Sequence, residues 1–150
     1  MIYPVKLDVH LRSVWHSDPP VILIGIDNNL EPATLLTDQT FCYEFDANSC
    51  STLTVELTNK TDADSVPSQG LDKAVIVESI SFFDITDPQF VWAGEYRPCY
   101  PEPWASQQTN LETVLKNHNY LGWNGKWTLT FDVPVFTWIH KIQNLGWIYT

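Results

Sequence analysis

Leu53-Thr-Val-Glu-Leu-Thr-Asn59 is the stretch of sequence on which the fold prediction depends most. Every second residue from Leu53 is apolar and the residues between are polar, which is the period of a strand with one buried face. A polar loop over residues 59–70 follows, and a long apolar run occupies residues 74–83. We therefore predict two neighbouring strands that bracket an acidic loop.

Similar patterns recur along the chain and predict further strands. These lie at residues 4–15, 21–26, 34–36, 41–45 and 127–133. Asp46-Ala-Asn-Ser49 supplies turn residues, and the sequence predicts a hairpin in which residues 53–57 return antiparallel to residues 41–45. Residues 136–140 and 146–149 are expected to close the fold, either as two strands or as a strand and a turn.

The region after the apolar run has a different composition. Proline and other breakers punctuate residues 86–108, which predicts a long surface excursion with one short strand at residues 90–92. Thr109-Asn-Leu-Glu112 then matches a capping box and is followed by apolar residues at helical spacing. A short helix of about two turns is expected there.

The number and spacing of these elements indicate the fold class. Short strands recur every ~8–12 residues with one short helix, which is typical of an all-β, two-sheet antiparallel β-sandwich of jelly-roll-like topology. A chain of 150 residues has the length of one ordinary domain. We predict a single domain over residues 1–150.

Composition excludes several classes of partner. The formal net charge of −10 opposes binding to nucleic acid and to anionic membranes. No apolar run approaches the ~20 residues of a membrane span, and the N-terminus carries no signal-peptide pattern, so we expect a soluble protein made in the cytoplasm. Three cysteines fit no zinc pattern, and we expect them to be reduced and buried as small apolar residues.

Sequence motifs for catalysis are absent. The chain contains no nucleophile elbow, no phosphate-binding glycine loop and no paired-histidine metal motif. Glu95 and Glu102 could act as the carboxylate pair of a glycosidase, although their separation cannot be read from the sequence. We expect the protein not to be an enzyme, and keep a glycan-active enzyme as the outside alternative.

The acidic loop is the best candidate for a metal site. Asp62, Asp64 and Asp72 offer the hard oxygen ligands that Ca²⁺ prefers, so calcium is the cofactor to test. Two other interpretations stay open. The loop is simply acidic and solvated, or the Lys60 ammonium pairs with these carboxylates and fills the site without metal, in an exposed pair worth at most ~1 kcal/mol.

Aromatic residues gather in the second half of the chain and suggest a sugar-binding platform. Sugar rings stack on aromatic faces while carboxylates accept hydrogen bonds from their hydroxyl groups. The candidate carbohydrate-binding residues are Tyr96, Tyr100, Glu102, Trp104 and Trp123. Equally, such a loop could fold onto the sandwich as a second core.

One segment resembles a known family. Asp72-Lys-Ala-Val-Ile-Val-Glu-Ser-Ile80, preceded by residues 53–59, is similar to a motif of small calcium-dependent xylan-binding modules. Asp72, Lys73 and Glu78 match the motif's aspartate, arginine and strand carboxylate. The resemblance implies a β-sandwich that binds sugar hydroxyl groups through Ca²⁺. Lys60, however, stands where that family has an aspartate, and a cation there opposes calcium.

A second resemblance concerns the C-terminal part of the chain. Residues 120–125 and 138–147 resemble small uncharacterised proteins of tailed marine bacteriophages, which implies a virion-associated or host-contact component.

Taken with the aromatic platform and the first resemblance, the predicted function is noncatalytic, lectin-like carbohydrate binding, with glycans or other protein subunits as partners. The alternative is a structural subunit of a virion, and a homo-oligomer also stays open.

Overall fold

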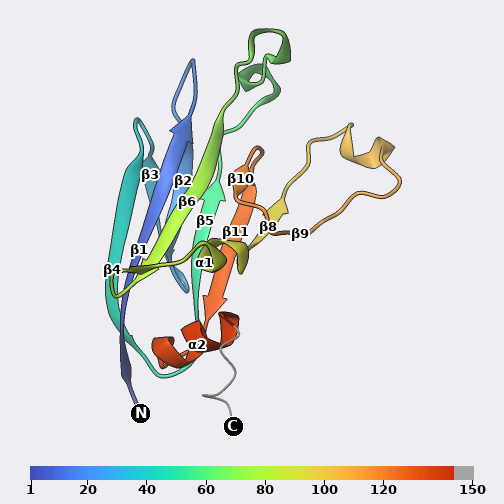
Figure 1. Ribbon diagram of the computed structural model, residues 1–150. Coiled ribbons are helices and arrows are strands. Elements are labelled where there is room, and N and C mark those ends of the chain that lie inside the picture. Colours follow the sequence, from blue (N-terminus) through green and yellow to red (C-terminus); the bar gives the residue numbers. More distant parts are fainter. Residues whose placement is uncertain (144–150) are drawn as a thin grey trace.

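The computed structural model describes residues 1–143 and contains two antiparallel β-sheets packed face to face (Figure 1). This architecture confirms the predicted all-β sandwich. The prediction that residues 1–150 form a single domain is not tested by this arrangement and stays a prediction.

Within residues 1–143 the two sheets have eleven strands between them, and two short α-helices accompany them. The first sheet has the order β10 (Tyr120–Leu121), β6 (Ala74–Phe82), β1 (Tyr3–Val14) and β4 (Gln39–Ala47), with β7 (Ile85–Thr86) paired to β6. The second has the order β3 (Asn29–Thr34), β2 (Val21–Ile26), β5 (Ser51–Leu57), β11 (Gly125–Phe131), β8 (Glu95–Pro98) and β9 (Leu115–Lys116). The helices are α1 (Pro88–Trp92) and α2 (Val135–Ile142).

The alternating strands form the core, as their period predicts. In β1 the alternate residues from Val5 to Leu11 are buried, and in β11 so are Trp127, Leu129 and Phe131. β1 is a central strand that pairs antiparallel with both β4 and β6. Removal of these apolar side chains from water is the main force that holds the two sheets together.

Two predicted strand pairings are wrong. β4 and β5 do not form a hairpin, because β4 pairs with β1 in one sheet while β5 pairs with β2 and β11 in the other. β5 and β6 are likewise not neighbours in a sheet. The loop over residues 58–73 therefore carries the chain from one sheet to the other. Hydrophobic period fixes which face of a strand is buried, but it does not identify the strand's partner.

Helices replace two predicted strands. Residues 136–140 lie in α2, because Val135, Trp138 and Ile139 follow helical spacing and are buried on one face. Residues 90–92 lie in α1, which Asp87 caps through a 2.8 Å hydrogen bond from the Gln89 N–H. Both helices pack aromatic residues against Phe82, which is why β-forming residue types occur in them.

The helix predicted at the Thr109 capping box does not form. Residues 109–114 are irregular, and Leu115 instead enters β9, where it pairs with Tyr96 of β8. A short helix needs tertiary packing to be stable, and Leu111 and Val114 are only half-buried. The surface excursion predicted for residues 86–108 is also interrupted, because Phe90, Val91 and Tyr96 belong to the core.

The surface differs from expectation at the cysteines. Cys42, Cys50 and Cys99 are all exposed, so the prediction that they are buried is wrong.

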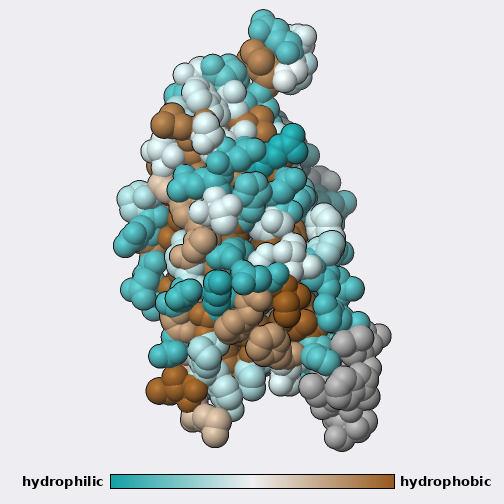
Figure 2. Space-filling view, turned by 60° about the vertical axis from the view of Figure 1, so that its left-hand side comes forward, coloured by the Kyte–Doolittle hydropathy of each residue, from teal (hydrophilic) through white to brown (hydrophobic). Residues whose placement is uncertain are grey.

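Figure 2 shows a mainly hydrophilic face, with hydrophobic residues gathered toward the end of the molecule where the N-terminus lies. Within residues 1–143, no helix has the length and hydrophobicity to cross a bilayer. The closing segment predicted at residues 146–149 lies outside the described residues.

Candidate functional site

The loop over residues 58–73 is folded by its own polar side chains. Thr61 begins a 3₁₀ turn at Asp62–Asp64, and Asp64 accepts hydrogen bonds from the Thr61 backbone at 2.7 Å and hydroxyl at 3.1 Å. A second 3₁₀ turn at Pro67–Gln69 ends at Gly70, whose φ of 66° suits glycine. These contacts order the loop between the two sheets.

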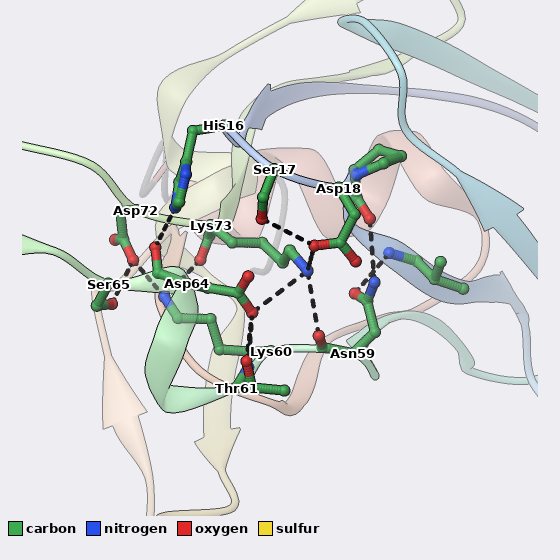
Figure 3. A network of polar contacts seen from close by, with 12 residues as sticks. His16, Ser17, Asp18, Asn59, Lys60, Thr61, Asp64, Ser65, Asp72 and Lys73 are labelled. Carbon is green, nitrogen blue, oxygen red and sulfur yellow. Dashed lines mark hydrogen bonds and ion pairs between the residues drawn. The ribbon is translucent and has the colours of Figure 1, made fainter.

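Lys73 lies buried at the centre of this region. Its ammonium group contacts Asp18 at 2.9 Å and Asp64 at 3.3 Å, and it also donates to the Asn59 carbonyl at 3.3 Å (Figure 3). The Lys73 side chain is 2% exposed and the Asp64 side chain 6%. Asp18 comes from the turn after β1, so this cation joins two segments that are distant in sequence.

Lys60 forms a second buried cation beside the first. Its ammonium group pairs with Asp72 and donates to the Lys73 carbonyl at 2.6 Å. Asp72 also accepts hydrogen bonds from Ser65 at 2.7 Å and Tyr120 at 2.6 Å. We call Lys60, Lys73, Asp18, Asp64 and Asp72 the lysine–aspartate network. Because the Lys60 side chain is 1% exposed, the interpretation of an exposed pair is wrong, although the pairing of Lys60 with Asp72 is present.

The network changes the titration of its aspartates. Burial by itself would raise the pKa of Asp72, but hydrogen bonds from Lys60, Tyr120 and Ser65 outweigh it and lower the pKa to about 2 from 3.8. The pKa of Asp64 is also lowered, because hydrogen bonds from Thr61 and Lys73 outweigh the effect of burial. Burial and the nearby Asp72 carboxylate raise the pKa of Tyr120.

These shifts predict a loss of stability in acid. A carboxylate whose pKa is lower in the folded state stabilises the fold above its unfolded pKa, and this contribution is lost as the pH falls through the folded value. For Asp72 this stabilisation is therefore lost as the pH falls from 3.8, the ordinary pKa of the carboxyl group, to about 2, its pKa in the folded protein. We expect Asp72 to contribute about 1–2 kcal/mol, measurable by urea unfolding across this range. Asp72→Asn should flatten the dependence, and an unchanged slope in that variant would contradict the assignment.

The three predicted metal ligands do not come together. Asp64 and Asp72 each pair with a different lysine, whereas Asp62 is exposed to solvent. Within residues 1–143, no group of three or more histidine, cysteine, aspartate or glutamate side chains could hold a metal ion. Two buried ammonium groups beside these carboxylates would repel a divalent cation. The residues present at this loop therefore do not fit calcium.

Calcium should consequently leave the stability of the protein unchanged. A cation that bound the folded state at a hundred times its Kd would add about 2.7 kcal/mol to the free energy of unfolding. Because the lysine ammonium groups already neutralise Asp64 and Asp72, we expect thermal melts in calcium and in chelator to coincide. A melting temperature several degrees higher in calcium would show that a metal site exists.

Four of the five predicted sugar-binding residues line one groove beside this loop. The groove has a volume of about 440 Å³ and lies where the 58–73 loop meets the excursion after β8. We call it the aromatic groove, and its lining residues are Asp62, Tyr100, Pro101, Glu102, Pro103, Trp104 and Trp123. The Tyr100 and Trp104 ring centroids are 5.4 Å apart, and Trp104 is 46% exposed. Flat apolar faces and two carboxylates are thus open to solvent together.

Tyr96, the fifth predicted residue, supports the groove from the core. Its side chain is buried, its hydroxyl group donates to the Trp123 carbonyl, and it accepts from the Trp123 N–H at 3.1 Å. Burial raises the pKa of Tyr96 to about 12. The ring of Tyr96 is therefore not available for stacking on a ligand, and its contacts fix the backbone of Trp123.

The lysine–aspartate network and the aromatic groove adjoin each other. The Lys60 ammonium lies 5.9 Å from the centroid of the Trp123 ring, and Asn124 exchanges hydrogen bonds of 2.7 and 3.0 Å with the Lys60 backbone. Sequence reasoning did not identify Asp18, Tyr120 or Asn124 as parts of this region. Their local sequence carries no signal of it, because only the folded chain brings them to the loop.

A second groove was not predicted either. It has a volume of about 480 Å³ and lies between the edge strands β3 and β4 of the two sheets. Phe41, Tyr43 and Phe45 line it from β4, but these rings are half-buried and pack against the core. Its aromatic rings are therefore less available to a ligand than Trp104.

Comparison with known proteins gives a structural likeness. No protein-family model matches the sequence, and no curated protein matches it significantly. A solved structure of vCBM60, described in the context of two circularly permuted families of calcium-dependent carbohydrate-binding modules, has a TM-score of 0.50 and 17% identity over 83% of this chain and 89% of its own. The complex of vCBM60 with galactobiose has a TM-score of 0.49 and 19% identity, over 83% and 96% of the two chains.

At this level of identity the likeness shows the fold. The chain shares the β-sandwich architecture of a carbohydrate-binding module, which agrees with the fold implied by the sequence resemblance. The resemblance to bacteriophage proteins stays a prediction.

Proposed function

We propose that this protein binds carbohydrate without catalysis and that the aromatic groove is the binding site. The observation that carries the proposal is the convergence of Tyr100, Trp104 and Trp123 with Glu102 and Asp62 around one open groove. Apolar faces of sugar rings stack on aromatic side chains, while hydroxyl groups donate to carboxylates. The groove offers both kinds of contact side by side.

The fold supports the same proposal by analogy. vCBM60 is a carbohydrate-binding module and has the same sandwich architecture. Fold alone does not determine function, so the aromatic groove of this chain carries the argument. The noncatalytic role follows from the absence of any catalytic motif in the sequence and from the likeness to a binding module.

In the proposed mode of binding, no calcium ion is held by the carboxylates of the 58–73 loop. vCBM60 is described among calcium-dependent modules, whereas in this chain Lys60 and Lys73 are buried beside the loop carboxylates. We propose that the two ammonium groups order the loop, and that the exposed rings of the groove supply the contacts with the sugar.

A glycan array tests the proposal directly. Labelled protein should bind a defined subset of glycans equally well in calcium and in chelator, because the proposed contacts come from aromatic rings and carboxylates of the groove and the nearby Asp64 and Asp72 are paired with lysines. Absence of binding to any glycan, together with stable oligomers in light scattering, would favour the alternative of a structural subunit, including one associated with a virion.

A further inference from the structure

The aromatic groove presents negative charge to solvent. Asp62 and Glu102 are exposed carboxylates in its lining. Among the described residues that line the groove there is no lysine, arginine or histidine. Across the whole sequence the formal net charge is −10, so the surrounding field has the same sign.

Lys60 lies beside the groove, but its charge is not available to a ligand. The Lys60 ammonium lies 5.9 Å from the Trp123 ring centroid, but its side chain is 1% exposed and its charge is paired with Asp72. A ligand in the groove therefore meets Asp62 and Glu102 without a counter-charge from Lys60.

Aromatic rings and carboxylates together favour a cationic ligand. The face of a tryptophan or tyrosine ring attracts an organic ammonium group within about 6 Å of its centroid, and such groups are commonly recognised by several rings at once. Tyr100, Trp104 and Trp123 supply three rings, and Asp62 and Glu102 add charge-assisted hydrogen-bond acceptors. An acidic sugar would be repelled by the same carboxylates.

From this chemistry we infer that the aromatic groove selects amino sugars, meaning glycans whose amino groups are free and protonated, over neutral and acidic glycans. The inference rests on the proposed function and names the class of ligand for the same site. The sugar rings stack on the aromatic faces, and the ammonium group lies between the rings and the carboxylates.

Three oligosaccharides of equal length test the inference. An oligomer of glucosamine, its fully N-acetylated form and an oligomer of a uronic acid should be titrated calorimetrically into the full chain at slightly acidic pH and low salt. We expect the glucosamine oligomer to bind about tenfold more tightly than the acetylated form, and the uronic acid oligomer to bind least. Added salt should reduce this preference, since it screens exposed charges.

Matched variants assign the preference to the groove. Glu102→Gln and Asp62→Asn should each reduce the ratio of the two affinities severalfold, because the amine oligomer loses a charge-assisted contact and therefore loses more affinity than the acetylated oligomer. Glu112→Gln removes the same charge from an exposed position outside the groove lining and should leave the preference intact. These substitutions are at exposed positions, so folding is expected to be retained.

The outcomes separate the inference from the proposed function. Equal or tighter binding of the acetylated or acidic oligomer would overturn the inference and leave carbohydrate binding in place. Failure of all three oligomers and of a glycan array would overturn both. Binding of choline or of a lysine-rich peptide without any glycan would show an ammonium site whose ligand is not a sugar, and would also overturn the inference.

Discussion

Lys73→Met is expected to destabilise the protein by about 3–5 kcal/mol, because it removes one partner of a buried ion pair and leaves the other uncompensated. The Lys73 side chain is 2% exposed, and Asp64, which it contacts at 3.3 Å, is buried as well. Methionine keeps much of the length and apolar volume of lysine, so the change mainly removes the charge. Urea unfolding at neutral pH measures the loss.

Two further variants identify the cause of that loss. Lys126→Met makes the same substitution at an exposed position of β11 and should change stability by less than about 0.5 kcal/mol. The double variant Lys73→Met/Asp64→Asn should recover part of the lost stability, since it neutralises the buried carboxylate while keeping an acceptor for the Thr61 hydrogen bond. A loss below about 1 kcal/mol in Lys73→Met would contradict the assigned role of the network.

Phe82→Ala, as a single variant, is expected to lower the free energy of unfolding by about 3–5 kcal/mol. Phe82 is fully buried, and its ring contacts Phe90 of α1, Phe131 of β11 and Trp138 of α2, with centroids 5.0 to 5.4 Å apart. Alanine would leave a cavity where the two sheets and both helices meet. Thermal or urea unfolding, compared with the unmodified protein, gives the difference.

Phe136→Ala is the control for this substitution. Phe136 is 50% exposed and contacts Phe83 at 5.1 Å between ring centroids. The same atoms are deleted, but much of the side chain is already in water, so we expect a loss of less than about 1 kcal/mol. Equal losses in the two variants would show that the cluster around Phe82 is not a centre of packing.

The sequence predicts the sandwich well because strand periodicity is a local property. The runs that begin at Val5, Phe41, Leu53 and Trp127 all form strands whose alternate residues face the core. Pairing is not local, and the sequence does not show that β4 and β5 belong to different sheets. The sequence of α2, which was predicted as a strand, does indicate a helix, because Val135, Trp138 and Ile139 are spaced as on one face of a helix.

The candidate site could be predicted in part for the same reason. Tyr100, Glu102 and Trp104 are close in the sequence and meet in the groove, and Trp123 joins them from the turn before β11. Asp62, predicted as a metal ligand, lines the same groove instead. Whether an aromatic residue such as Tyr96 faces the core or the solvent depends on the strand it enters, and β8 was not predicted.

The most direct test of carbohydrate binding at the aromatic groove compares two tryptophans. Trp104 in the groove and Trp92 at the end of α1 are 46% and 44% exposed, so replacing either with alanine removes a similar exposed ring. Calorimetric titration with the strongest glycan from the array should show an affinity about tenfold lower for Trp104→Ala, equivalent to about 1.4 kcal/mol, and unchanged affinity for Trp92→Ala. Unchanged affinity in Trp104→Ala, or an equal loss in both variants, would contradict binding at this groove.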